Sequence, residues 1–170
     1  MANQKKSILI VEKDREVARA VKDWLEKGDY TCQILHSLQM AETWVLDSNM
    51  HHDLILLDHW QEKDLSHCDR ISGKPATFGS QHLLQEIASA GIPVISIADD
   101  SQVKRKFHGH NKVMGYHQRG RLLELTTLDH THPDAKEFFT RIDKAIEKAE
   151  HQASKKHARI NDAESSERRR

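Results

Sequence analysis

Acidic side chains follow two of the most apolar stretches in this sequence, and they are the residues best placed to do chemistry. Asp58 closes the run DLILLD, and Glu12, Lys13 and Asp14 follow the run SILIV. Open α/β sheets hold their functional groups at the carboxyl ends of buried strands. Asp58 is therefore the candidate centre of a functional site, and the residues that surround it decide its chemistry.

The apolar runs predict the strands that position these acids. The four aliphatic residues before Asp58 show no alternation, so we expect a strand buried on both faces, as in the centre of a parallel sheet. The expected strands are residues 7–11, 31–36, 53–58, 92–98 and 112–117. The expected helices are residues 14–27, 38–47, 81–90, 100–112 and 133–149. This alternation predicts one doubly wound α/β domain, with a five-stranded parallel sheet and helices on both faces.

Right-handed crossovers bring the ends of the first, third, fourth and fifth strands to one edge of such a sheet. The residues at those ends are Glu12, Lys13, Asp58, Ala98, Asp99 and Arg119. We therefore expect these side chains to surround a single pocket, with Asp58 at its centre.

The rest of the chain divides into two connections and a tail. Residues 59–79 and about 121–133 are long polar connections, which are usually functional or mobile in a compact domain. The domain is expected to span residues 1–149. Residues 150–170 have almost no apolar content and are expected to form a charged helical extension or a disordered tail, with no second folded domain after the first.

Composition excludes several classes of protein. The chain has 26 basic and 26 acidic residues, so its net charge gives no general attraction to nucleic acid or anionic membranes. No apolar run approaches the roughly 20 residues that span a bilayer, and the N-terminus lacks a signal-peptide core. The two cysteines form no CxxC pair, which favours a reducing, cytoplasmic compartment.

Two other kinds of site are disfavoured by the same sequence. The closely spaced histidines are better explained as solvated loop residues, because a zinc site needs four convergent ligands and neither CxxC nor HExxH is present. They are His51 and His52, His108 and His110, and His130 and His132. The basic residues near 104–121 form an ordinary charged face, and no aromatic interleaving indicates nucleic-acid binding. Because no nucleophile–base pair is evident, we do not expect an enzyme such as a hydrolase or metalloenzyme.

Four segments together resemble the receiver domain of bacterial two-component response regulators. They are ILIVEKDREV, DLILLD, IPVISIAD and GYHQRG, and the resemblance covers residues 7–149. It implies the flavodoxin-like fold of that family. It also implies that Asp58 matches the phosphorylated aspartate, that Glu12 and Lys13 match the acidic pair that holds Mg²⁺ with the aspartate, and that Tyr116 matches the switch aromatic.

Several of the matched positions depart from the family pattern. Lys13 replaces an acid, with Asp14 as the next carboxylate. Ala98 stands where a Ser or Thr would bond the phosphoryl group, Asp99 follows it, and Arg119 replaces a Lys. A positive charge about 4 Å from a metal ion costs on the order of 4 kcal/mol per unit charge at an effective dielectric near 20. We therefore expect no cofactor, or only weak Mg²⁺ binding at Glu12 and Asp58, and we hypothesise that the Lys13 ammonium pairs with Asp58 in place of the cation.

The resemblance implies a stand-alone, divergent receiver domain, or pseudo-receiver, in two-component phosphorelay signalling. It would act by contact with a protein partner or with a second copy of itself, through the last strand and helices, with impaired or absent Mg²⁺-dependent phosphorylation. The alternative is a functional single-domain response regulator that a histidine kinase phosphorylates on Asp58, with Glu12 and Asp14 as metal ligands.

Overall fold

The computed structural model describes residues 5–47, 51–58, 61–68, 75–79, 83–84, 86–87, 90–97 and 113–167. Five strands form one parallel sheet in the order β2-β1-β3-β6-β7. They are β1 (Ser7–Val11), β2 (Thr31–Leu35), β3 (Leu54–Asp58), β6 (Val94–Ile97) and β7 (Val113–His117). The order places β3 in the centre, where all five of its residues are buried, and it confirms the predicted doubly wound α/β fold.

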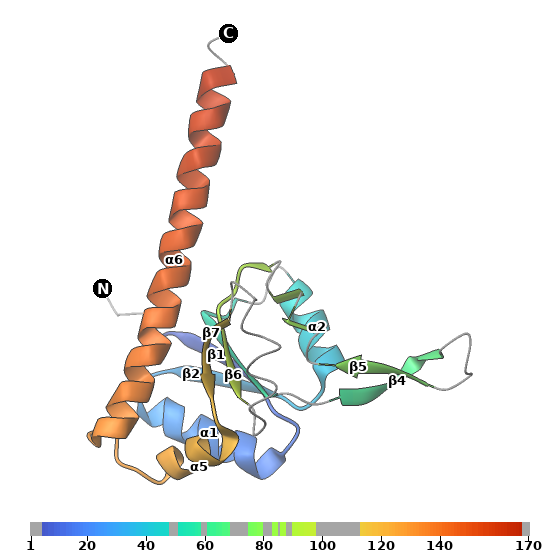
Figure 1. Cartoon of the computed structure of the whole chain (residues 1–170), viewed down its shortest axis with the longest axis vertical. Helices are drawn as coiled ribbons and strands as arrows, with labels where there is room; N and C mark the ends of the chain where they lie inside the picture. The colour runs from blue at the N-terminus through green and yellow to red at the C-terminus, as the bar shows by residue number, and fades with distance from the viewer. Residues whose placement is uncertain are drawn as a thin grey trace.

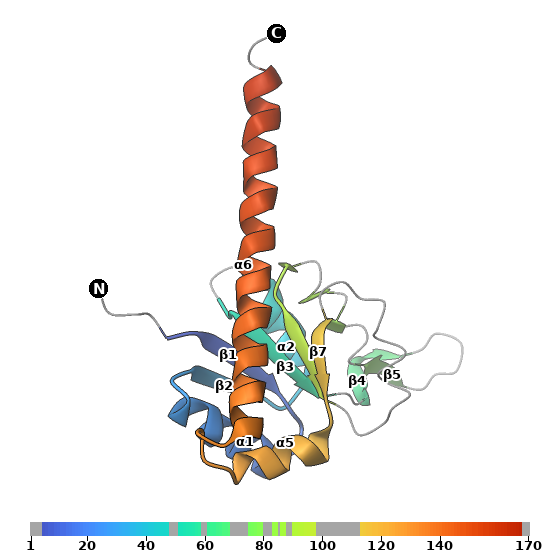
Figure 2. The same cartoon turned by 60° about the vertical axis from the view of Figure 1, so that its left-hand side comes forward.

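Helices cover both faces of the sheet and divide the core in two (Figures 1 and 2). The helices are α1 (Arg15–Lys27), α2 (Leu38–Leu46), α5 (Arg119–Thr126) and α6 (Pro133–Glu167). One core joins α1, α5 and α6 to the sheet through side chains such as Ile8, Trp24 and Phe138. The other lies under α2 and the helical residues Leu83 and Ile87. Alternate residues of each central strand enter opposite cores, because side chains alternate across a strand.

The two ends of α1 follow the predicted sequence signals. Asp14 caps the first turn, where its Oδ1 accepts hydrogen bonds from the backbone N–H groups of Glu16 at 3.0 Å and Val17 at 3.2 Å. Gly28 follows the last turn as its C-cap. α1 therefore starts immediately beside the acidic cluster that follows β1.

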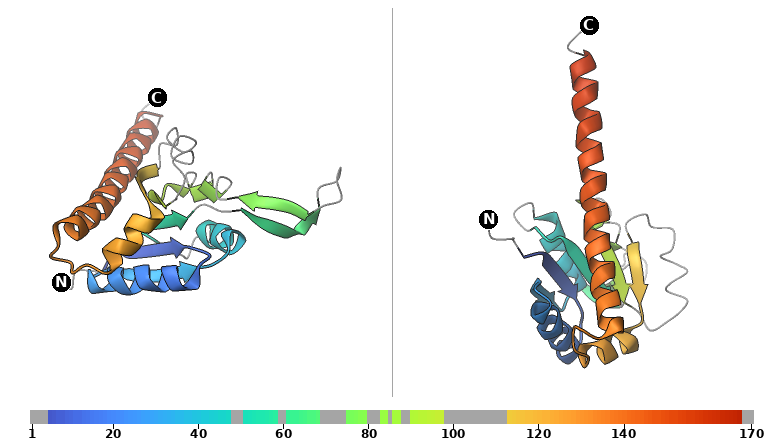
Figure 3. Two further views of the ribbon diagram at one scale, coloured as in Figure 1. Left: turned by 60° about the horizontal axis from the view of Figure 1, so that its bottom comes forward. Right: turned by 90° about the vertical axis from the view of Figure 1, so that its left-hand side faces the viewer.

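Two segments differ from the expected arrangement, and a third takes one of its two expected forms. Residues 59–79, expected as a polar connection, contain the antiparallel hairpin of β4 (Gln61–Cys68) and β5 (Pro75–Gly79), which projects from the domain (Figure 3, left). The second expected connection, 121–133, begins inside α5, because Leu122 and Leu125 lie three residues apart and are buried beside α1. The last helix continues to Glu167, so the tail is helical over 150–167. The expected helix at 100–112 lies outside the described residues.

α6 is attached to the domain by a cluster of aromatic rings. The ring centroid of Phe139 lies 4.6 Å from that of Trp24 and 5.8 Å from that of Tyr30, and the His130 ring meets Phe139 edge-on at 5.1 Å. The Trp24 indole N–H also donates a hydrogen bond to the backbone carbonyl of Leu128 at 3.2 Å. These contacts fix the start of α6 against α1 and β2.

Gly28 lies directly against this aromatic cluster. We therefore expect stability to be sensitive to any side chain added at this position. A Cβ atom at Gly28 would lie 2.6 Å from Cε1 of Phe139, whose ring is held by its aromatic neighbours. We expect Gly28→Ala to lower the free energy of unfolding by about 1–3 kcal/mol, as overpacking does elsewhere. Urea unfolding measures the change, and Gly120→Ala is the control because a Cβ at Gly120 meets nothing within 4 Å. Equal stabilities of the two variants would contradict this packing.

Within the described residues, no helix combines the length and the apolar character that crossing a membrane requires.

Candidate functional site

The carboxyl ends of β1 and β3 bring two buried acids together. Asp58 is the last residue of β3 and is 5% exposed. Glu12 follows β1 directly and is 2% exposed. The backbone N–H of Glu12 donates to the carbonyl of Leu35 at 3.0 Å, which extends the β1–β2 ladder by one residue and holds Glu12 in place. The ends of β1 and β3 therefore fix the positions of both carboxyl groups.

Asp14 completes a group of three acids and orients Glu12. The Asp14 backbone N–H donates a hydrogen bond to Oε1 of Glu12 at 2.8 Å. The Asp14 carboxylate caps α1, so the turn from β1 into α1 holds two carboxyl groups at the same edge of the sheet. A ring nitrogen of His36 lies 2.7 Å from the Glu12 carbonyl oxygen and supports the same turn.

Arg119 supplies the positive charge of this pocket. Its Nη2 donates to Oε1 of Glu12 at 3.1 Å and lies 3.5 Å from Oδ2 of Asp14, and its Nε lies 4.0 Å from Oδ2 of Asp58. One guanidinium thus contacts all three acids. Arg119 is the first residue of α5, where the helix dipole opposes a positive charge, so the carboxylates and not the helix stabilise it there.

The structure corrects the expected role of Lys13. The hypothesis that Lys13 pairs with Asp58 is not met, because the Lys13 side chain is exposed and, among the described residues, the cation beside Asp58 is Arg119. The reason lies in the turn after β1: Glu12 is buried and Asp14 caps α1, so the residue between them is directed to solvent. Arg119 also lies at the start of α5, after β7 has ended, and not at the end of the strand as expected.

The remaining predicted positions are only partly described. The backbone of Tyr116 lies in β7 and pairs with Ser96 of β6. The Tyr116 side chain, Ala98 and Asp99 lie outside the described residues. Their predicted roles as switch and phosphate-contact residues therefore stay predictions.

Burial raises the pKa of Glu12 to about 7. The hydrogen bond from the Asp14 N–H lowers this pKa, the Asp58 charge raises it and Arg119 lowers it again. Burial therefore outweighs the guanidinium, and Glu12 changes its charge near neutral pH. The pocket can hold one proton that an exposed glutamate would already have lost.

This pKa predicts how stability changes with pH. Between about pH 4.5 and 7 the folded state keeps the Glu12 proton after the unfolded chain has lost it, so this group makes stability fall as pH rises. Burial lowers the pKa of His52, which contributes the opposite slope. Glu12→Gln should remove the fall in stability that Glu12 causes and leave the contribution of His52. The unfolding free energy of the variant, relative to that of the parent, should therefore increase from pH 5 to pH 7. Urea unfolding across this range measures it, and parallel profiles for the two proteins would contradict the shift.

Arg119 and a divalent cation would compete for the same carboxylates. Mg²⁺ needs several oxygen ligands in octahedral geometry. In the described part of the chain, no three His, Cys, Asp or Glu side chains form a group that could hold a metal ion. The guanidinium of Arg119 lies among the carboxylates that would otherwise provide those oxygens.

The described histidines make ordinary structural contacts. The His52 ring lies between two partners: its Nε2 accepts from the Trp44 indole N–H at 3.0 Å, and its Nδ1 lies 3.0 Å from Oγ of Ser7. Because Nε2 accepts a hydrogen bond, neutral His52 carries its proton on Nδ1 and donates it to Ser7. In this tautomer His52 therefore cannot accept a proton from Ser7.

No protein-family model matches the sequence, and no curated protein matches it. Solved structures do match its fold. The N-terminal domain of a response regulator/sensory box/GGDEF 3-domain protein from Carboxydothermus hydrogenoformans is 20% identical, with a TM-score of 0.60, over 87% of this chain and 99% of that chain.

Two other solved structures show the same likeness. The response regulator receiver domain protein from Methanospirillum hungatei JF-1 is 16% identical, with a TM-score of 0.60, over 88% of this chain and 99% of that chain. An adenylate cyclase from Rhodopirellula baltica is 13% identical, with a TM-score of 0.61, over 91% of this chain and 97% of that chain. Likeness at such identities concerns the fold. The chain therefore has the fold of a response regulator receiver domain.

Proposed function

We propose that this chain is a divergent receiver domain in two-component signalling that acts by protein–protein contact and does not depend on Mg²⁺-dependent phosphorylation. Its pocket would be held in one state by Arg119. The fold likeness to receiver domains supports the signalling class. The altered pocket supports the divergent mode of action.

The contact of Arg119 with all three acids is the observation that carries the proposal. Phosphoryl transfer to a carboxylate needs positive charge placed to neutralise both partners, usually by a metal ion. Here a fixed guanidinium already neutralises part of the charge of Glu12, Asp14 and Asp58. An entering cation would have to displace Arg119 or share its ligands, and either event costs binding free energy.

A small-molecule phosphodonor tests the proposal. The full chain is incubated with acetyl phosphate and Mg²⁺, and its intact mass is measured over time. We expect no stable gain of one phosphoryl group, and we expect Asp58→Asn to behave in the same way. A gain in the parent that disappears in Asp58→Asn would establish the alternative, a regulator that a histidine kinase phosphorylates on Asp58.

A chain that acts in this way needs a protein partner and no chemistry of its own. We propose that it is not an enzyme. The partner would be a signalling protein, such as a histidine kinase, or a second copy of the chain.

A further inference from the structure

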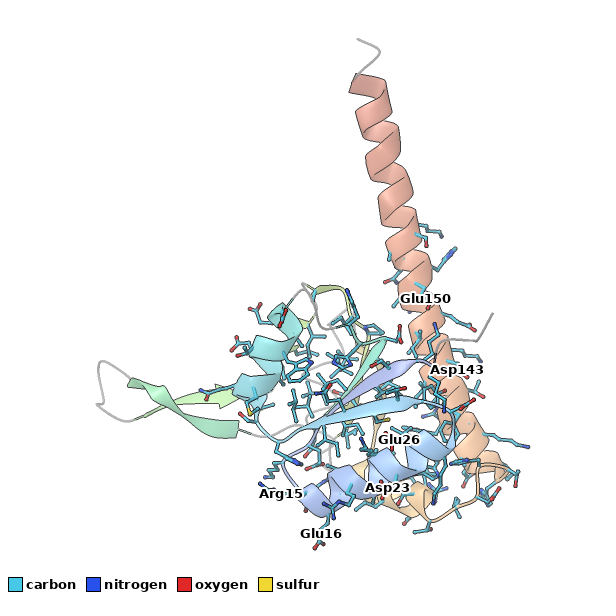
Figure 4. All side chains as sticks on the ribbon, turned by 180° about the vertical axis from the view of Figure 1, so that it is seen from behind. Arg15, Glu16, Asp23, Glu26, Asp143 and Glu150 are labelled. Atoms are coloured by element: carbon cyan, nitrogen blue, oxygen red, sulfur yellow. The ribbon has the colours of Figure 1, made fainter. Side chains whose placement is uncertain are left out.

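α6 continues well beyond the domain on which it packs (Figures 1 and 2). Its first half is anchored: Phe138, Ile142 and Ile146 are buried, and Asp143 accepts a hydrogen bond from the Tyr30 hydroxyl at 2.7 Å. Glu150 pairs with Lys6, the residue before β1, and Figure 4 shows Asp143 and Glu150 along this anchored part. After Glu150 the helix rises away from the domain, and residues 151–155 are exposed.

The projecting segment, residues 151–167, mixes strong and weak helix formers. It contains alanine, lysine, arginine and glutamate residues together with three serines, an asparagine and an aspartate, whose side chains compete for backbone hydrogen bonds. Most helices in proteins are stabilised by packing of one face. An extension of about 25 Å, at 1.5 Å per residue, is therefore better explained if another surface packs against it.

Charge in the projecting segment is separated along the helix. The basic block comes first and consists of Lys155, Lys156 and Arg159. The acidic block follows and consists of Asp162, Glu164 and Glu167. Ile160, the only large aliphatic residue of the segment, lies between the blocks. A helix with this order of charges is complementary to a copy of itself that runs in the opposite direction.

We propose that residues 151–167 pair with the same segment of a second copy of this chain in antiparallel orientation. With the two-fold axis between residues 161 and 162, Lys156 and Arg159 lie at the level of Glu167 and Glu164 of the other copy, and Ile160 lies at the level of Ala163. A parallel pair in register would instead place like charges side by side. A few exposed ion pairs and one small apolar contact predict weak association, with a dissociation constant on the order of 10–100 µM.

This inference specifies the partner of the contact-based function proposed above, but it does not depend on the state of the Arg119 pocket. Phosphorylation of Asp58 would contradict the proposed function and leave this pairing untouched. Failure to associate would leave the pocket untouched.

Charge-reversal variants of the full chain test the pairing. One variant carries Lys155→Glu, Lys156→Glu and Arg159→Glu, and the other carries Asp162→Lys, Glu164→Lys and Glu167→Lys. Each variant places like charges throughout its segment, so we expect at least a tenfold weaker self-association in sedimentation velocity at low salt. An equal mixture of the two variants should regain association. Thermal unfolding checks that the domain stays folded, because the changed residues lie outside it.

Small-angle X-ray scattering of the parent distinguishes the orientation. An antiparallel pair centred near residue 161 separates the two domain centres by about 65 Å, at 1.5 Å per helical residue, whereas a parallel pair places the domains side by side. The proposal predicts an elongated dimer that dissociates in 1 M salt, where the charges are screened. A parent that stays monomeric at 0.5 mM, variants that associate as tightly as the parent, or a compact dimer would overturn it.

Discussion

Replacing Arg119 with alanine is expected to lower the free energy of unfolding by about 3 kcal/mol at pH 8, which is the lower end for removing one partner of a buried ion pair. The substitution leaves Glu12 and Asp58, which are 2% and 5% exposed, without the guanidinium that contacts both. The lower end applies because the Arg119 side chain is itself 23% exposed. At pH 5 the loss should be smaller, because Glu12, whose pKa is about 7, is then protonated.

Urea unfolding at the two pH values measures this loss, and two variants serve as controls. Arg121→Ala removes the same side chain two residues later, where its ion pairs with Glu124 and Asp134 are exposed, and should cost clearly less than Arg119→Ala. Lys13→Ala should change stability by about 0.5 kcal/mol or less, since Lys13 is exposed. If Lys13→Ala were as destabilising as Arg119→Ala, the assignment of the pocket cation would be wrong.

The Arg119→Ala variant should also gain a response to Mg²⁺. Removal of the guanidinium removes the positive charge that contacts Glu12, Asp14 and Asp58, so an entering cation no longer has to displace it. We expect 10 mM Mg²⁺ to raise the thermal midpoint of this variant by several degrees, through ligand binding to the folded state, and to leave the parent unchanged. A response of equal size in the parent would show that Arg119 does not exclude the metal.

Replacing Trp24 with alanine is expected to lower the free energy of unfolding by about 3–5 kcal/mol, the usual cost of truncating a buried large aromatic side chain. Trp24 is 3% exposed and contacts His130, Phe138 and Phe139, so it joins α1 to both the start of α6 and the segment before it. The truncation also removes the indole donor to the Leu128 carbonyl. In this variant the anchored half of α6 should lose its packing on the domain before the central strands are affected.

Hydrogen exchange locates the effect of Trp24→Ala, and chemical denaturation gives its size. Faster exchange should appear in residues 133–146 of α6 before it appears in β1 or β3. Trp24→Phe keeps the ring contacts and loses only the indole donor, so it should cost about half as much or less. Uniformly faster exchange with no preference for α6 would contradict the anchoring role of the cluster.

The sheet could be predicted from the sequence because its signals are local and strong. The run before Asp58 has four consecutive aliphatic residues, which only a strand buried on both faces explains in a domain of this size. The caps of α1 were predictable for the same reason, since Asp14 and Gly28 act through hydrogen bonds within a few residues. The position of Asp58 at the pocket followed directly from the strand order.

The contents of the pocket depend on side-chain direction, which the sequence does not give. Glu12, Lys13 and Asp14 are adjacent, but the turn into α1 buries the first, exposes the second and uses the third as a cap. Arg119 was placed at the pocket by the predicted strand ends, whereas its contact with all three acids arises because α5 begins there. α5 itself was missed because its apolar signal is short, with only Leu122 and Leu125 buried.

The hairpin of β4 and β5 was missed for a different reason. The sequence of β4, QEKDLSHC, is rich in residues that are depleted in strands and does not alternate apolar with polar residues. Its strand conformation comes from pairing with β5, which is not apparent in the local pattern.

A crystal structure determined after soaking with beryllofluoride and Mg²⁺ tests most directly whether Arg119 takes the place of a metal ion in the pocket. The account predicts that Arg119 stays within hydrogen-bond distance of Glu12 and that neither Mg²⁺ nor beryllofluoride binds at Asp58. Both ligands bound at Asp58, with Arg119 displaced from Glu12, would contradict it.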